Sequence, residues 1–198
     1  MPRLTDELIL VDERNRAIGR GEKLAVHRQA LLHRAFSIFL VYPDGKVLLQ
    51  QRSKAKYHSG GLWANSCCGH PRPGERTAQA ARRRLREELG VTVSLRSGFR
   101  ARYRTQLPNG LTENEIVYVF FGRAPAAFAL NPDEVAAAAP MSLPQLKLDI
   151  VRRPARYAYW LRYYFKEHYA AIRRGVAAEA RPPAASKPQA DSTALAAK

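Results

Sequence analysis

The chain has 198 residues, of which 46% are hydrophobic, and a formal net charge of +16. This length suits one globular domain with terminal extensions. No apolar run reaches about 18 residues, so no transmembrane helix is expected, and the charged N-terminal stretch lacks the apolar core of a secretory signal. The two cysteines, Cys67 and Cys68, are adjacent and therefore poorly placed to bridge each other. We expect free thiols, a reducing cytoplasmic setting and no membrane association.

The positive charge has three interpretations: nucleic-acid binding, the handling of anionic phosphorylated molecules, or simply high arginine usage. Nine arginines and two glutamates lie between Arg76 and Arg104, whereas Arg173 to Lys198 hold five basic and two acidic residues. The charge therefore belongs to the folded body more than to the tail. Because no nucleic-acid-binding motif accompanies it, we favour a cleft that attracts anions and expect no nucleic-acid partner.

The first half of the chain contains clear strand signals. Leu8 to Val11 predicts a short strand. Phe36 to Tyr42 and Val47 to Gln51 are β-prone segments on either side of the turn sequence Pro43-Asp44-Gly45, which indicates a hairpin. Glu113 to Phe121, rich in β-branched and aromatic residues, predicts a further strand.

The clearest helix is predicted over Thr77 to Leu89, where Ala78, Ala81, Leu85 and Leu89 recur at helical spacing. We expect Thr77 to be its N-cap and Gly90 to end it. Val91 to Leu95 is expected to resume as a strand.

The second half is harder to assign. Val135 to Leu148 is ambiguous, and we expect it to be helical in part; Pro154 to Arg174 is expected to form an aromatic, basic helix. From Arg181 onward the composition changes to Ala, Pro, Ser and Lys, which is typical of a disordered tail. We therefore expect a domain over residues 1–175 and a disordered basic tail over 176–198. Alone, these elements indicate an α/β or α+β fold.

One stretch carries a spaced set of charged residues and glycines: Gly69, Glu75, Arg83, Leu85, Glu87, Glu88, Gly90 and Val91. It resembles the Nudix box, a loop–helix–loop that holds a divalent metal against a diphosphate. Carboxylate and phosphate oxygens suit hard Mg²⁺. The pattern is broken at Arg84, where the box has a glutamate. This departure disfavours Nudix hydrolysis and favours diphosphate binding by Arg84.

Helical geometry separates the two remaining acids. At about 100° per residue, Glu88 lies roughly 60° from Leu85 and flanks the apolar stripe, whereas Glu87 falls on the solvent face. Glu88 is therefore the better candidate for a partly buried metal ligand. The alternative is a solvated helix with Arg83–Glu87 and Arg84–Glu88 pairs.

A second motif is more specific. Trp63-Ala64-Asn65-Ser66-Cys67-Cys68-Gly69-His70-Pro71 resembles the Trp-x-Asn-x-x-Cys-Gly-His-Pro segment of type 1 isopentenyl-diphosphate isomerases, and Thr112 to Glu115 resembles their Glu-x-Glu strand. The resemblance extends over about residues 22–160. It implies a Nudix-like central mixed β-sheet flanked by helices.

The resemblance also implies roles for individual residues. The catalytic residues it indicates are Cys68, Glu115, Tyr103 and Trp160. The basic residues expected around the diphosphate are Lys23, Arg52, Lys56 and, from the broken box, Arg84. The ligands expected for a divalent metal are His27, His33, His70, Glu113 and Glu115. Glu88 and the Cys68 carbonyl match a Mg²⁺ site that engages the diphosphate.

The chemistry of these residues agrees with the resemblance. Moving a double bond within a five-carbon diphosphate requires one proton to be added and another removed, which a thiol and a carboxyl can share. Protonation creates a tertiary cation, which an aromatic face such as Trp160 stabilises. The cation must also be shielded from water.

The expected metal site has a transition-metal character, because three imidazoles and two carboxylates suit Mn²⁺ or Zn²⁺ better than Mg²⁺. Glu113 and Glu115 are two apart on a strand and so share one face. The family usually has one residue more between its first two histidines than the five that separate His27 and His33. We interpret the other histidines, His58 and His168, as structural or solvated, and Cys67 as a small buried residue.

Three functions are thus weighed. The favoured one is an isomerase that interconverts isopentenyl and dimethylallyl diphosphate, acting on a small molecule as a monomer or a dimer. The second is a Nudix hydrolase of a nucleoside diphosphate derivative, and the third is a basic nucleic-acid-binding module, which the net charge alone supports.

Overall fold

The computed structural model describes residues 7–181, so most of the tail expected over residues 176–198 lies outside the described residues. The strands are β1 (Glu7–Val11), β2 (Ala17–Glu22), β3 (His33–Val41), β4 (Val47–Arg52), β5 (Trp63–Asn65), β6 (Cys67–Gly69), β7 (Arg96–Gln106), β8 (Thr112–Arg123) and β9 (Val135–Met141). The helices are α1 (Lys23–Arg28), α2 (Thr77–Leu89), α3 (Leu143–Arg152), the 3₁₀ turn η1 (Pro154–Arg156), α4 (Tyr159–Glu167) and α5 (Tyr169–Ala180).

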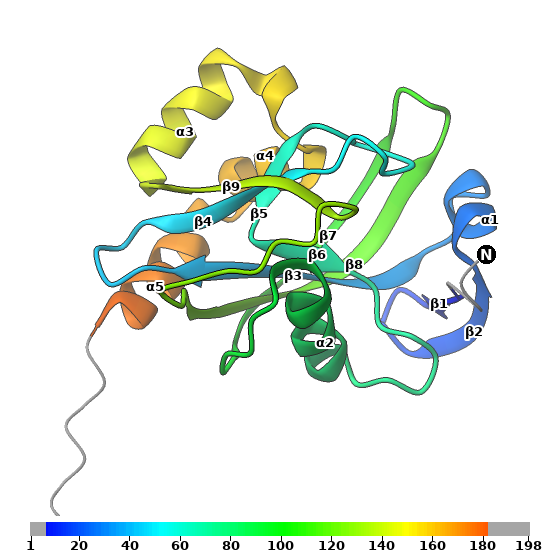
Figure 1. The fold of residues 1–198 in the computed structure, drawn as a ribbon. Coiled ribbons are helices and arrows are strands. Elements are labelled where there is room, and N and C mark those ends of the chain that lie inside the picture. Colours follow the sequence, from blue (N-terminus) through cyan, green and yellow to red (C-terminus); the bar gives the residue numbers. More distant parts are fainter. Residues whose placement is uncertain (1–6, 182–198) are drawn as a thin grey trace, which may run out of the picture.

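The strands form one mixed sheet built around β3 (Figure 1). β8 runs parallel to β3 from the pair His33–Glu115 to the pair Val41–Arg123, and β7 extends this part as an antiparallel neighbour of β8. β6 pairs with β3 in antiparallel fashion and sets Cys68 opposite Ser37. β4 carries β5 and β9, both antiparallel to it. The expected mixed central sheet with flanking helices is confirmed.

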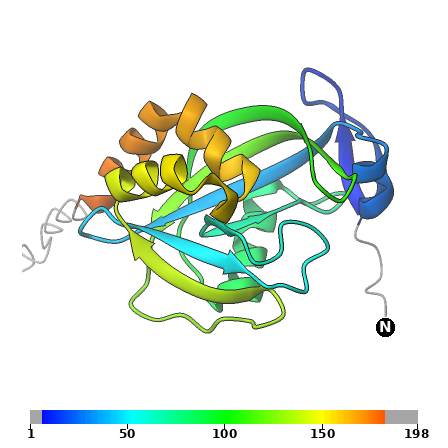
Figure 2. The same ribbon diagram turned by 90° about the horizontal axis from the view of Figure 1, so that it is seen from above.

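Helices cover both faces of the sheet. Alternate residues of β3 point to opposite faces, and because both faces are covered the strand is apolar from Ala35 to Val41 except at Ser37. Phe36 and Ile38 pack toward α2 together with Leu85, whereas Phe39 packs with residues of α3, α4 and α5. Figure 2 shows these last three helices grouped over one side of the sheet. β3 therefore lies between two apolar cores. It also carries one of the residues of the site described below.

Several expected elements are confirmed. The first strand and the hairpin are present, with Val41 paired to Val47 across the turn. Helix α2 spans the residues expected, and Gly90 ends it with a left-handed φ of 67°. The N-cap, however, is Arg76 and not Thr77, which is the first residue of the helix. The N–H of Arg76 donates to Oε1 of Gln79 at 3.2 Å and so closes the first turn.

Two expectations in the other segments are wrong in detail, and a third, a helix over part of Val135 to Leu148, is confirmed. Residues 91–95 form no strand, and β7 begins only at Arg96. The ambiguous segment is a strand over Val135–Met141, where pairing with β4 outweighs the helix preference of four alanines; its helix starts at Leu143. The single helix expected over 154–174 is divided into η1, α4 and α5.

Helix α5 continues to Ala180, so the expected domain boundary at residue 175 falls inside it. Within residues 7–181, no helix has both the length and the apolar character needed to cross a membrane.

Candidate active site

Three histidines reach one point from three different elements. His33 is the first residue of β3, where the parallel register places it beside Glu115 of β8. His27 lies in the last turn of α1, a helix whose first amides are capped by the side chain of Glu22. His70 directly follows β6. The sheet register therefore brings together residues that are far apart in the sequence.

These histidines and two glutamates form one compact cluster. One ligand atom from each residue lies within 4.8 Å of all the others, in the set His27, His33, His70, Glu113 and Glu115. The short spacing from His27 to His33 therefore does not prevent His27 from joining the cluster.

The cluster has the character of a metal site. Nδ1 of His27 hydrogen-bonds to the Lys23 carbonyl at 2.6 Å, and Nδ1 of His33 to the Leu31 carbonyl at 2.8 Å. These bonds turn both Nε2 atoms inward, where they are buried and lack a hydrogen-bond partner among the described residues, as does Oε2 of Glu113. Three imidazoles, two of them with unpartnered inward nitrogens, and two carboxylates fit a divalent transition metal.

The two carboxyls of the cluster differ in their surroundings. Glu115 accepts a hydrogen bond of 2.5 Å from the Tyr103 hydroxyl at Oε2, and His70 Nε2 lies 2.8 Å from Oε1. Although burial opposes ionisation, His33 and His70 hold the pKa of Glu115 well below its ordinary range. Burial and the charge of Glu115 raise the pKa of Glu113. The pair is thus polarised, with Glu115 the more acidic of the two.

A cavity of about 350 Å³ opens onto this cluster, a size at the lower end of the range for small-molecule sites. It brings together all but three of the residues expected from the sequence. The expected residues that line it are Lys23, Arg52, Lys56, Cys68, His70, Arg84, Tyr103, Glu113, Glu115 and Trp160. Other lining residues include His58, Ser37, Arg72, Arg83, Asp133 and Glu134. His27 and His33 belong to the cluster behind this wall, and Glu88 contacts the wall through Arg84 and Lys56.

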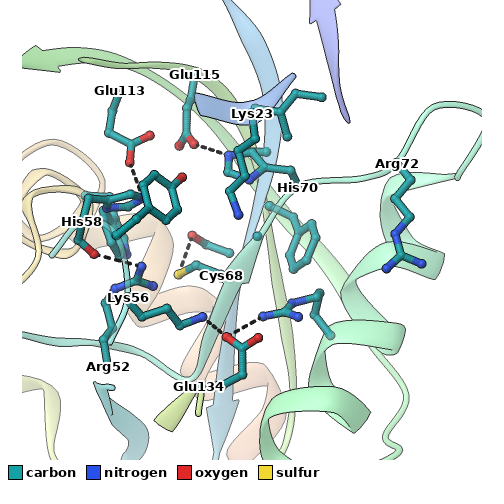
Figure 3. A pocket seen from close by; sticks show the side chains of 18 of the residues that line it. Lys23, Arg52, Lys56, His58, Cys68, His70, Arg72, Glu113, Glu115 and Glu134 are labelled. Carbon is teal, nitrogen blue, oxygen red and sulfur yellow. Dashed lines mark hydrogen bonds and ion pairs between the residues drawn. The ribbon is translucent and has the colours of Figure 1, made fainter. Parts of the chain in front are cut away.

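Cys68 lies in the middle of the cavity view, with Glu113 and Glu115 toward one end and Glu134 toward the other (Figure 3). Its thiol donates to Oδ1 of Asn65 at 3.2 Å. The Asn65 amide nitrogen donates in turn to the carbonyls of Ile38 and Cys67, which fixes the oxygen toward the sulfur. Burial raises the pKa of the Cys68 thiol to about 12. The neighbouring Cys67 is fully buried in the core against α2 and does not line the cavity.

The other end of the cavity, called the cationic end below, carries Arg84 and Lys56, both ion-paired with acids. Arg84 contacts Glu87, Glu88 and Glu134, and Nζ of Lys56 contacts Glu134 and lies 4.0 Å from Glu88. Burial lowers the pKa of Lys56 to about 8. Glu88 is almost wholly buried, as helical geometry predicted, and its second oxygen accepts from Gln50 at 3.2 Å. Both oxygens of Glu88 thus have partners, namely two cations and an amide donor. In the histidine cluster, by contrast, the Nε2 atoms of His27 and His33 have none among the described residues.

Trp160 supplies an aromatic wall. It belongs to α4 and is 4% exposed. The guanidinium carbon of Arg52 lies 5.3 Å from its ring centroid, so the indole already interacts with a positive group.

Sequence reasoning did not select several residues that the fold places here. Glu134 bridges Lys56 and Arg84, and Ser37 lies 3.5 Å from the Cys68 sulfur and 3.0 Å from the Tyr164 hydroxyl. His58, expected to be structural or solvated, is not solvated, because its side chain is only 7% exposed, and its Nε2 lies 3.2 Å from Oε1 of Glu113. No local spacing marks these residues, because their partners lie in distant elements.

Comparison with known proteins agrees with this geometry. The family model described as NUDIX domain matches residues 31–162. Isopentenyl-diphosphate Delta-isomerase 2 of Aromatoleum aromaticum is 47% identical over 158 residues, covering 80% of this chain and 84% of the relative. The Isopentenyl-diphosphate Delta-isomerase of Pectobacterium atrosepticum is 42% identical over 159 residues, covering 80% of this chain and 89% of that one.

Solved structures agree at the level of the fold. DR0079 from Deinococcus radiodurans superimposes with a TM-score of 0.67 at 23% identity, covering 86% of this chain and 99% of that one. The MutT protein of Methanosarcina mazei gives a TM-score of 0.55 at 20% identity, covering 68% and 91%. With a Nudix domain, relatives above 40% identity and the two sequence motifs gathered around one cavity, this chain belongs to the isopentenyl-diphosphate Delta-isomerase family.

Proposed function

We propose that the protein interconverts isopentenyl diphosphate and dimethylallyl diphosphate, a step of isoprenoid biosynthesis, by adding a proton to one carbon and removing a proton from another. The observation that carries the proposal is the shared cavity: a thiol, Cys68, and a carboxyl, Glu115, line it together with an aromatic wall and a cationic end. Each of these four features corresponds to one requirement of the reaction.

The cationic end suits the diphosphate. Arg84 and Lys56 lie there with Arg52 and Lys23 in the same wall. A guanidinium offers paired N–H donors to phosphate oxygens, and Lys56 adds a compact charge. The diphosphate would bind together with Mg²⁺, and Glu88 and the Cys68 carbonyl would hold that ion.

The acid–base pair suits the proton transfers. A proton added to the terminal methylene carbon leaves a tertiary cation, and loss of a proton from the chain methylene beside that centre forms the internal double bond. Cys68 and Glu115 divide the two transfers and exchange roles in the reverse direction. The proton gained by one group must return to the other before the next turnover, so no net proton is consumed.

The walls suit the intermediate. The Trp160 ring provides a π-face for the tertiary cation, and the Tyr103 hydroxyl holds Glu115 in place at 2.5 Å. Burial of both residues keeps bulk water from trapping the cation.

The histidine cluster suits a resident divalent metal, Mn²⁺ or Zn²⁺. His27, His33, His70, Glu113 and Glu115 would hold it. When bound, such an ion would neutralise the two neighbouring carboxylates and fix the orientation of Glu115. The proposal keeps the reducing, cytoplasmic setting that a catalytic thiol needs.

The alternative, hydrolysis of a nucleoside diphosphate derivative, has less support. It would use the helix acids of the Nudix box to gather metals and activate water. Position 84 carries arginine, and the Glu87 and Glu88 carboxylates are paired with it. The box thus lacks one of its acids, and the two that remain are ion-paired with the arginine that replaces it.

One assay decides between the two reactions. Purified protein is incubated with isopentenyl diphosphate, Mg²⁺ and Mn²⁺, and products are followed by NMR and by a phosphate assay. We expect dimethylallyl diphosphate and no phosphate. Phosphate release without isomer formation would overturn the proposal. Nucleoside diphosphate derivatives, tested in parallel, should remain intact.

A further inference from the structure

His58 occupies an unexpected place for a histidine with no local motif. It lies in the loop between β4 and β5, lines the cavity and directs Nε2 toward Oε1 of Glu113 at 3.2 Å (Figure 3). It is not a member of the five-residue cluster. The imidazole therefore contacts a member of the cluster from outside.

The surrounding loop fixes the orientation of this imidazole. Arg52 donates from Nη2 to the His58 carbonyl at 3.3 Å. The ring meets Tyr57 edge to face at 4.3 Å and Trp160 at 6.1 Å, and its Nδ1 lies 3.3 Å from the Ser59 hydroxyl. Ser59 itself has a φ of 50°, a left-handed conformation that a serine adopts at a cost. The chain thus accepts local strain in the residue directly after His58.

The contact with His58 restricts the orientation of the Glu113 carboxylate. Glu113 is 2% exposed, it lies on the same strand face as Glu115, and its Oε2 points toward His27 Nε2 at 3.5 Å without a hydrogen-bond partner among residues 7–181. A carboxylate has two equivalent oxygens and rotates about one bond. With Oε1 held by His58, the other oxygen is presented to the three histidines.

We propose that His58 is a positioning residue of the metal site, which donates its Nε2–H to Oε1 of Glu113 and so directs Oε2 to a divalent transition metal. The inference rests on the metal cluster of the proposed function. Partners of this kind, one step behind a ligand, typically change metal affinity by about 10- to 100-fold. The donor is required because an ionised carboxylate only accepts hydrogen bonds.

The test measures metal binding without substrate. Metal-free native protein, His58→Ala and His58→Gln are titrated with Mn²⁺ and with Zn²⁺ against a chelator of known affinity. We expect the Kd of His58→Ala to rise about 10- to 100-fold and that of His58→Gln to rise less, because the glutamine amide still offers an N–H donor. His168→Ala is the matched control, since His168 stacks on Phe99 and does not line the cavity.

A double-mutant cycle makes the assignment specific. In a Glu113→Gln background, His58→Ala should change the Zn²⁺ affinity little, because the carboxylate that it positions is gone. A native Kd in both His58 variants, a loss equal to that of His168→Ala, or full additivity with Glu113→Gln would each overturn the inference. If His58→Ala does not fold, His58→Phe, which fills the same space without an N–H donor, replaces it in the cycle. Because no substrate is present, a failure of isomerase activity in the native protein would be seen separately and would concern the proposed function instead.

Discussion

The Cys68 sulfur and the Asn65 amide oxygen lie 3.2 Å apart, with the thiol as the donor. Since both amide hydrogens of Asn65 are directed to main-chain carbonyls, its oxygen cannot turn away. This hydrogen bond explains why the side chains of two adjacent cysteines have different environments. Cys68 faces the cavity with a defined proton, whereas Cys67 faces the α2 core.

Cys68→Ala is expected to lower kcat by at least about 10²-fold, because it removes one of the two acid–base groups. Cys67→Ala should keep most of the activity and cost about 1 kcal/mol of stability through lost packing. Steady-state kinetics and urea unfolding of both variants check this. Equal losses of kcat in the two would refute the choice of cysteine.

Trp160 is expected to act on the transition state more than on substrate binding. Trp160→Phe should lower kcat by about tenfold, and Trp160→Leu by more, because a weaker π-face and then none remain for the cation. KM should change less than kcat. A purely structural role would instead appear as lost stability with kcat intact, which thermal melts run alongside the kinetics would reveal.

Arg84→Glu restores the acid that the Nudix box has at this position. We expect KM for isopentenyl diphosphate to rise by about 10-fold or more, because a phosphate-binding charge is lost and another negative charge joins Glu88 and Glu134. Arg84→Lys should be intermediate. Appearance of phosphate release in Arg84→Glu would show that the departure from the pattern alone had suppressed hydrolysis.

Removal of the metal should lower stability as well as activity. The buried cluster leaves unpartnered imidazole nitrogens and two adjacent carboxyls when no ion neutralises them. We expect chelation to lower Tm and added Mn²⁺ or Zn²⁺ to restore it. His27→Ala should abolish most of this metal-dependent shift, and a shift of native size in that variant would exclude His27 as a ligand.

The Glu75–Arg83 pair gives a pH-dependent contribution to stability. Arg83 donates to both Glu75 oxygens at 2.9 Å, which lowers the pKa of Glu75 below its ordinary 4.5. A depressed carboxyl pKa stabilises the fold above the unfolded value, and this contribution is lost as pH falls through the folded value. Glu75→Gln should therefore cost about 1 kcal/mol at pH 7. In urea unfolding the difference from the native protein should shrink below about pH 4; a constant difference would contradict the pair.

Motifs with a fixed local spacing were predictable from the sequence. The loop and helix from Gly69 to Gly90 place Glu88 by geometry alone, and the strand alternation at Glu113 and Glu115 predicts a shared face, as the cluster confirms. The assigned catalytic and binding roles remain predictions, although the expected residues meet at one cavity.

Features that depend on contacts between distant segments could not be predicted from the sequence. The alanine run before Pro140 has helix-forming composition, yet it becomes β9 because β4 offers an edge to pair with. The sequence assigns no site role to His58 or Glu134, because a lone histidine and a lone glutamate belong to no motif. Their importance arises from Glu113, Lys56 and Arg84, each in another element.

The two halves of the metal cluster are attached to the fold with different stiffness. Glu113 and Glu115 sit inside β8, which is hydrogen-bonded to β7 along its length and to β3 from Glu115 onward, whereas a loop with Ala30 at a φ of 55° joins α1 to His33. An inserted or deleted residue in that loop changes only its path, whereas one between the glutamates would turn a carboxylate to the opposite face of the sheet. Tolerance of length variation is thus confined to the histidine side, which explains how this chain, with one residue fewer between His27 and His33 than the family usually has, still assembles one cluster.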